Sequence, residues 1–136
     1  MMKHFKVQEL VDPDTYAKYG DNSLKYFNAD ALTMLDNIRE FFACPVTVNN
    51  WHTGGSFKWR GLRNPSSPVY SAGSMHSKGR AFDCDVLGYT AEQARQKIIE
   101  NKDNQLLRGV MRMEAGVNWL HIDNKPRSNR IYQFKV

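Results

Sequence analysis

The chain has 136 residues, of which 41% are hydrophobic and 24% charged, and its formal net charge is +5. This length is enough for one domain with its own core, and the composition excludes a disordered chain. The net charge favours anionic partners such as nucleic acid, anionic lipid or acidic cell-wall polymers, although the basic residues are scattered and form no long run.

The N-terminal region, residues 1–27, is expected to be irregular, with turn residues at Asp12-Pro13-Asp14 and at Gly20-Asp21-Asn22. No apolar run of signal-peptide length follows the first positive charges, and no stretch approaches the roughly 20 apolar residues of a membrane span. We therefore expect synthesis in the cytoplasm without a signal peptide. A protein made in this way and acting elsewhere needs another route of release.

The middle of the chain begins with a predicted helix over residues 29–42, where an apolar stripe recurs at helical spacing. Asn28 or Asp30 is expected to cap its start, and Pro45 to close its end. Residues 45–51 predict a short strand. The Gly-, Ser- and Pro-containing segment 52–75 is too long for an ordinary connection, which is typical of a functional loop.

Four further elements complete the pattern. Residues 80–88 predict a strand, and residues 90–101 predict a second helix with a capping box between Thr90 and Gln93. Three strand candidates follow, over residues 108–116, 118–124 and 130–136. Helices that flank strands joined by turns predict an α+β fold, with residues 1–136 forming a single domain around a central antiparallel sheet.

The two cysteines, Cys44 and Cys84, fit no metal-binding spacing. Two buried thiols are the simpler interpretation, and one disulfide between them is the alternative.

Two imidazoles and one carboxylate are the candidate metal ligands: His76, Asp83 and His121. Strand alternation places Asp83 and His121 each on a polar face whose opposite side is apolar. Three protein ligands leave one position of a tetrahedral zinc ion open to water, as in a catalytic site. A lone His–Asp pair at such a spacing is usually coincidence, so the hypothesis depends on the three residues together.

The residues around the ligands support this hypothesis. Gly79 permits a turn of the backbone, and Ala81 leaves room beside the strand. Ser74 is placed to orient His76 by a hydrogen bond.

The patterns S-x-H-x-x-G-x-A-x-D and, later in the chain, W-x-H-x-D are similar to those of a known family. They resemble the zinc D,D-carboxypeptidases and endolysins that cleave peptidoglycan (peptidase family M15), and most closely the short domains of phage and prophage proteins. The wider superfamily includes D-Ala-D-Ala dipeptidases, lysostaphin-type enzymes and the hedgehog signalling domain. The likeness covers most of the chain and includes the Gly-Leu-Arg at 61–63.

The resemblance implies zinc ligation by His76, Asp83 and His121 in a surface cleft, together with an acidic general base. Many members carry this acid at a position that is Asn118 here, and an amide cannot take up a proton at neutral pH. Glu114 is the favoured substitute, and Asp123 is the alternative base or a hydrogen-bond acceptor for a ligand imidazole. A solvated charge at a strand end is the competing interpretation of Glu114.

A cationic group is also needed, to stabilise the negative charge that develops on the substrate carbonyl. Arg63 is the first candidate and Arg60 the second. Aromatic and imidazole side chains that could line the cleft are Trp59, Tyr70, Trp119 and His52.

The resulting expectation is a monomeric zinc metallopeptidase that hydrolyses an amide bond in a peptidoglycan stem peptide, of the D-Ala or L-Ala/D-Glu type, with no nucleic-acid partner and no transmembrane segment. Lacking a signal peptide, such an enzyme would reach the bacterial cell wall after phage-type release. The alternative is a non-catalytic, zinc-containing module that binds peptide or cell wall, which Asn118 favours. A nucleic-acid-binding domain is a more distant third, because no recognition motif accompanies the charge.

Overall fold

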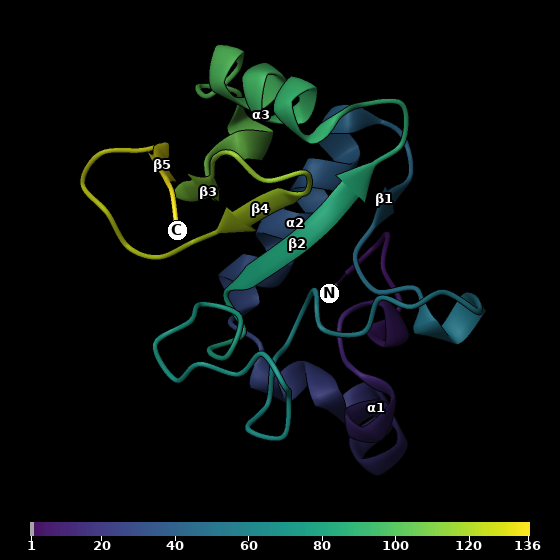
Figure 1. The fold of residues 1–136 in the computed structure, drawn as a ribbon. Helices are drawn as coiled ribbons and strands as arrows, with labels where there is room; N and C mark the ends of the chain where they lie inside the picture. Colours follow the sequence, from purple (N-terminus) through teal and green to yellow (C-terminus); the bar gives the residue numbers. More distant parts are fainter. Residues whose placement is uncertain (1) are drawn as a thin grey trace.

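A five-stranded mixed sheet organises the chain, in the order β1-β2-β4-β3-β5 (Figure 1). The computed structural model describes residues 2–136. The strands are β1 (Val46–Thr47), β2 (Ala81–Val86), β3 (Arg112–Glu114), β4 (Leu120–Asp123) and β5 (Tyr132–Phe134). Together with three α-helices they form an α+β fold, as expected from the sequence.

The prediction of an antiparallel sheet is wrong for β5, which pairs with β3 in parallel. The other strand pairs are antiparallel. Both edges of β4 are already occupied, by β2 and β3. The chain therefore reverses after β4 and adds to the free edge of β3, so β5 runs in the same direction as β3.

Two of the three α-helices confirm the sequence prediction. Helix α2 (Ala29–Phe42) is capped by the side chain of Asn28, and α3 (Ala91–Glu100) begins with the capping box of Thr90 and Gln93. Helix α2 packs against one face of the sheet, and α3 lies across one end of it (Figure 1).

The expectation that residues 1–27 are irregular is wrong. Asp12 caps a third helix, α1 (Pro13–Tyr19), in which Pro13 occupies the first turn. Asp12-Pro13 is therefore a helix start rather than a turn, because proline lacks only an N–H that has no partner at that position. Single-turn and longer 3₁₀ segments complete the region and recur later: η1 (Val7–Glu9), η2 (Gly20–Tyr26), η3 (Trp51–Thr53) and η4 (Gln105–Leu107).

The two faces of β2 and β4 have different chemistry. Phe82 and Cys84 on β2, with Leu120 and Ile122 on β4, are buried in the core beneath α2. Burying each large apolar side chain of this kind contributes on the order of 2 kcal/mol to folding. Because side chains alternate along a strand, the intervening residues project from the other face, where the polar candidates lie.

The segment between η3 and β2 lies along the edge of β2. The backbone N–H of Asp83 donates to the Arg60 carbonyl at 2.8 Å, and the N–H of Leu62 donates to the Leu10 carbonyl at 2.9 Å. A side chain at Gly61 would collide with the Leu10 carbonyl, so only glycine allows this close approach. Part of the long loop is thus fixed against the sheet and against η1.

Cys44 and Cys84 are both free thiols, and burial raises the pKa of the Cys84 thiol. Within residues 2–136, no helix has the length and apolar character required to cross a bilayer.

Candidate metal centre

The structure brings together the three candidate ligands from separate parts of the chain. Asp83 on β2 lies directly opposite His121 on β4 in the antiparallel pairing, and His76 comes from the turn before β2. One ligand atom from each residue lies within 4.8 Å of the others. All three residues are buried, with exposed fractions of 3% for His76, 6% for Asp83 and 5% for His121.

Each of the two imidazole rings has one nitrogen that bonds to a group behind it and one that faces Asp83. Nδ1 of His76 lies 3.0 Å from the Gly61 carbonyl, which can only accept, so this nitrogen carries the hydrogen. Nε2 of His121 lies 2.8 Å from Oδ2 of Asp123, and Nδ1 lies 2.9 Å from Oδ1 of Asp83, so either nitrogen can donate to a carboxylate. The neutral His76 ring therefore has its lone pair on Nε2, and the neutral His121 ring has its lone pair on Nδ1 in the tautomer that donates to Asp123.

Both lone pairs face the same carboxylate. Nε2 of His76 is 3.3 Å from Oδ2 of Asp83, and Nδ1 of His121 is 2.9 Å from Oδ1. Three electron-rich atoms in one buried place repel one another unless a positive charge lies between them. Two imidazole nitrogens and one carboxylate oxygen form a donor set that zinc prefers, so the residues present fit such an ion.

The electrostatics of the cluster show the same need for positive charge. Burial lowers the pKa of His121, but hydrogen bonds to Asp123 and Asp83 outweigh this effect and raise the pKa to about 9. Burial likewise raises the pKa of Asp83, yet hydrogen bonds with His121 and His76 bring it well below its usual range. The fold therefore stabilises the Asp83 carboxylate, and a proton on His121 supplies the opposite charge. A metal ion bound between these residues can replace that proton.

Asp123 contacts His121 through Nε2, the ring nitrogen on the side away from Asp83. It is fully buried, and its carboxylate also accepts hydrogen bonds from Arg112 at 2.8–3.1 Å and from the Lys125 N–H at 3.1 Å. This arrangement matches the hydrogen-bonded carboxylates that orient metal-ligating histidines in proteins.

Arg63 contacts the cluster directly, and Glu114 ends β3, the strand that pairs with β4. Nη2 of Arg63 donates to Oδ2 of Asp83 at 3.1 Å, and Nε donates to the Trp59 carbonyl at 2.8 Å. Burial lowers the pKa of Arg63, while the negative charges of Asp83 and Glu114 act in the opposite direction. Glu114 is half-buried at the end of β3.

A cavity of about 470 Å³ opens beside Asp83. Arg60 stands at its wall, stacked on Phe57 at 3.9 Å and paired with Asp85 at 2.9 Å. A volume of this size accommodates a short stretch of peptide. The residues that line it are Phe57, Arg60, Arg63, Asp83, Asp85, Asn118 and Trp119.

The remaining candidates are not among the residues that line this cavity. Ser74 accepts a hydrogen bond from the backbone N–H of His76 at 3.1 Å, so it holds the main chain while Gly61 holds the ring. His52 packs edge-on against Trp51 in η3. Tyr70 lines a different cavity, which shares Arg63 with the first.

Arg95 and Arg112 support the site and were not singled out from the sequence. Arg95 is 3% exposed and donates to the carbonyls of Glu114, Val117 and Trp119 at 3.4, 3.0 and 3.0 Å. It thereby fixes the turn between β3 and β4. Its position next to Ala94, on the apolar stripe of α3, was the available signal, because an arginine there must be buried and satisfied.

Comparison with known proteins gives no family assignment: no family model, no curated protein and no solved structure matches this chain.

Proposed function

We propose that this chain is a zinc-dependent peptidase that hydrolyses an amide bond in a peptidoglycan stem peptide. The observation that carries the proposal is the convergence of Nε2 of His76, Nδ1 of His121 and the Asp83 carboxylate, with both rings held by hydrogen bonds from behind. Zinc bound by these residues would supply a Lewis acid that polarises a water molecule and a carbonyl.

The side chains around the cluster have complementary roles in this proposal. Glu114 accepts a proton from the attacking water as the C–O bond forms and then returns it to the leaving nitrogen, after which the C–N bond breaks. The guanidinium of Arg63 has N–H donors beyond the two used in the fold, and these stabilise the negative charge on the carbonyl oxygen. Asp123 keeps the imidazole of His121 in one tautomer and orientation.

The substrate class follows from the resemblance of the ligand motifs to peptidoglycan peptidases and is supported by charge. The net charge of +5 suits an acidic cell-wall polymer, and the cavity beside Asp83 is lined by two arginines, Arg60 and Arg63. Both are paired with an aspartate, but Arg60 uses both terminal nitrogens on Asp85, whereas Nη1 of Arg63 is left for the peptide.

A second candidate is a zinc-containing module that binds such peptides without cutting them. It is favoured by one specific observation: Asn118 lines the cavity at a position where an acid would be expected from the resemblance. The two candidates differ in whether Glu114 can replace that acid.

The test combines zinc content with the release of peptides from purified peptidoglycan, for the wild type, His121→Ala and Glu114→Gln. The peptidase proposal expects one zinc per wild-type chain, loss of zinc and activity in His121→Ala, and retained zinc with activity reduced at least about a hundredfold in Glu114→Gln. Zinc without any activity in the wild type would favour the binding module. Full activity in Glu114→Gln would exclude this residue as the base.

A further inference from the structure

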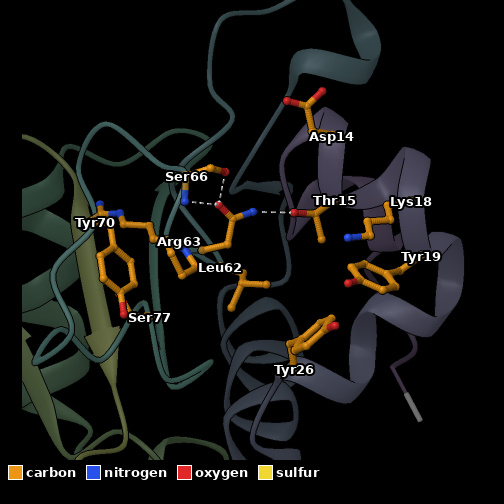
Figure 2. A pocket seen from close by; sticks show the side chains of 12 residues that line it. Asp14, Thr15, Lys18, Tyr19, Tyr26, Leu62, Arg63, Ser66, Tyr70 and Ser77 are labelled. Atoms are coloured by element: carbon orange, nitrogen blue, oxygen red, sulfur yellow. Dashed lines mark hydrogen bonds between the residues drawn. The ribbon is translucent and has the colours of Figure 1, made fainter.

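A second cavity, of about 590 Å³, lies between the α1–η2 region and the loop that precedes β2 (Figure 2). It is larger than the cavity beside Asp83, and its size suits a small ligand or several residues of an extended chain. Its lining comes from both sides: Asp14, Thr15, Lys18, Tyr19 and Tyr26 from one, and Leu62, Arg63, Asn64, Pro65, Ser66, Tyr70 and Ser77 from the other.

The two walls of this cavity are tied together by hydrogen bonds. Nδ2 of Asn64, in the loop, donates to Oγ1 of Thr15, in α1, at 2.7 Å. Oδ1 of Asn64 accepts from the hydroxyl of Ser66 at 2.6 Å and from its N–H at 3.0 Å. The side chain of Leu62 is buried and forms part of the lining. The shape of the cavity is thus set by the fold rather than created by a ligand.

Arg63 connects this cavity to the candidate metal centre, because it lines both cavities. Figure 2 shows its side chain running along the loop wall, with the guanidinium pointing away from α1. That guanidinium donates to Asp83, one of the three candidate ligands. A ligand that occupies both cavities passes over this arginine.

The chemistry of the second cavity favours an anionic group beside flat, partly apolar surfaces. The exposed ammonium of Lys18 lies 5.2 Å from the ring centre of Tyr19 but forms no salt bridge with any carboxylate in residues 2–136, and Asp14 is the only acid that those residues contribute to the lining. In Figure 2 Asp14 stands at the rim, with its carboxylate turned away from the tyrosines.

Three tyrosines line this cavity, and a second lysine lies next to two of them. Lys25 places its ammonium 4.8 Å from the ring centre of Tyr19 and 5.2 Å from that of Tyr26, which adds positive charge close to the cavity. Tyr26 and Tyr70 are 41% and 39% exposed, so their rings are open to contact with a ligand. Rigid aromatic rings with a polar hydroxyl bind peptides at little cost in conformational entropy.

We propose that the cavity of Lys18 and the three tyrosines binds a carboxylate-bearing part of the peptide substrate that flanks the bond to be cut. The inference rests on the proposed function for the identity of the peptide, and it adds a recognition site for an acidic residue remote from the metal. An ammonium that packs on a tyrosine ring and has no carboxylate partner in the described residues can give such a carboxylate a charge-assisted hydrogen bond.

The test is direct binding, measured separately from cleavage, by fluorescence anisotropy. The probes are a labelled L-alanyl-D-glutamyl tetrapeptide and the same peptide with D-glutamine in place of D-glutamate. The zinc-loaded Glu114→Gln protein serves as the background, so that the peptide stays intact. We expect the glutamyl peptide to bind about tenfold more tightly than the glutaminyl peptide, and Lys18→Met to abolish this difference. Lys102→Met, which removes an exposed lysine outside both cavities, is the matched control and should preserve it.

The outcomes separate this inference from the proposed function. If the wild type cleaves the peptide but Lys18→Met still prefers the glutamyl to the glutaminyl peptide, the inference is overturned and the peptidase proposal stands. No discrimination between the two peptides in the Lys18-containing protein would overturn it as well. Discrimination that depends on Lys18, in a chain that cuts nothing, would support the inference and disprove the peptidase proposal.

Discussion

Asp123→Asn tests whether the cluster is built to hold a metal. Asp123 uses both carboxylate oxygens: Oδ2 accepts from Nε2 of His121 and Nη2 of Arg112, each at 2.8 Å, and Oδ1 accepts from Nε of Arg112 at 3.0 Å and from the Lys125 N–H at 3.1 Å. Asparagine keeps the shape but has only one acceptor oxygen. In either orientation of the amide, its NH₂ group therefore faces two donors, and the negative charge is lost.

Two effects of different size follow. Loss of the acceptor behind a ligating histidine lowers metal affinity by about 10–100-fold, or roughly 1.4–2.8 kcal/mol. Without metal, removing one partner from a buried ionic network costs about 3–5 kcal/mol of the free energy of unfolding. We expect the lower end for this protein, because the Arg112 side chain retains 16% exposure and can rehydrate. A domain with a typical stability of about 5–15 kcal/mol stays folded after such a loss.

The measurements are the zinc Kd, by competition with a chromophoric chelator near neutral pH, and thermal unfolding followed by circular dichroism in excess chelator. Asp85→Asn is the matched control. Asp85 lies on the same face of β2 as the candidate ligand Asp83, but its side chain is 50% exposed and pairs with Arg60 instead of a ligand. It should change the zinc Kd by less than about twofold, as expected for an exposed ion pair. A zinc Kd that is the same in Asp123→Asn as in the wild type would refute the reasoning.

Three further predictions concern the surroundings of the cluster. Arg95→Met should lower kcat for peptide hydrolysis by at least about tenfold with little change in the zinc Kd, because Arg95 holds the turn beside Glu114 and not the ligands; equal loss of both would contradict this role. In chelator-treated protein, the melting temperature should fall as the pH rises from about 6.5 to about 9. The folded-state pKa of His121 is raised to about 9, so protonated His121 stabilises the fold fully below its unfolded-state pKa of about 6.5, and this stabilisation is lost as the ring deprotonates. A melting temperature that does not change over this pH range would contradict the raised pKa. Gly61→Ala should lower the free energy of unfolding by about 1–3 kcal/mol in chemical denaturation, since its Cβ meets backbone, whereas Gly73→Ala has open space and should change it by less than about 0.5 kcal/mol.

Periodicity predicted the helices and strands in which local signals agree with the packing. The bounds of α2 follow from its apolar stripe and from the cap at Asn28, and the start of α3 follows from the capping box at Thr90. The same alternation placed Asp83 and His121 on the face away from the core, as the structure has them.

The features that could not be predicted depend on contacts between distant segments. The parallel placement of β5 follows from the occupied edges of β4, which no local pattern along residues 130–136 reveals. Gly61 accepts the hydrogen bond of His76 because the loop is pressed against Leu10, and the sequence gives no sign of that contact. The burial of Arg95 beneath a turn depends likewise on how α3 meets the sheet.

The origin of the three ligands has a consequence for folding. His121 and Asp83 are 38 residues apart in the chain and are brought together by a non-local strand pairing, whereas His76 arrives with an irregular loop. Both cysteines are free, so no disulfide joins these segments. An ion held by all three would act as a cross-link, lowering the entropy of the open chain much as a disulfide does. Removal of the ion should then first release the loop from the sheet, and this would be visible as faster amide hydrogen exchange around residues 60–79 than in α2.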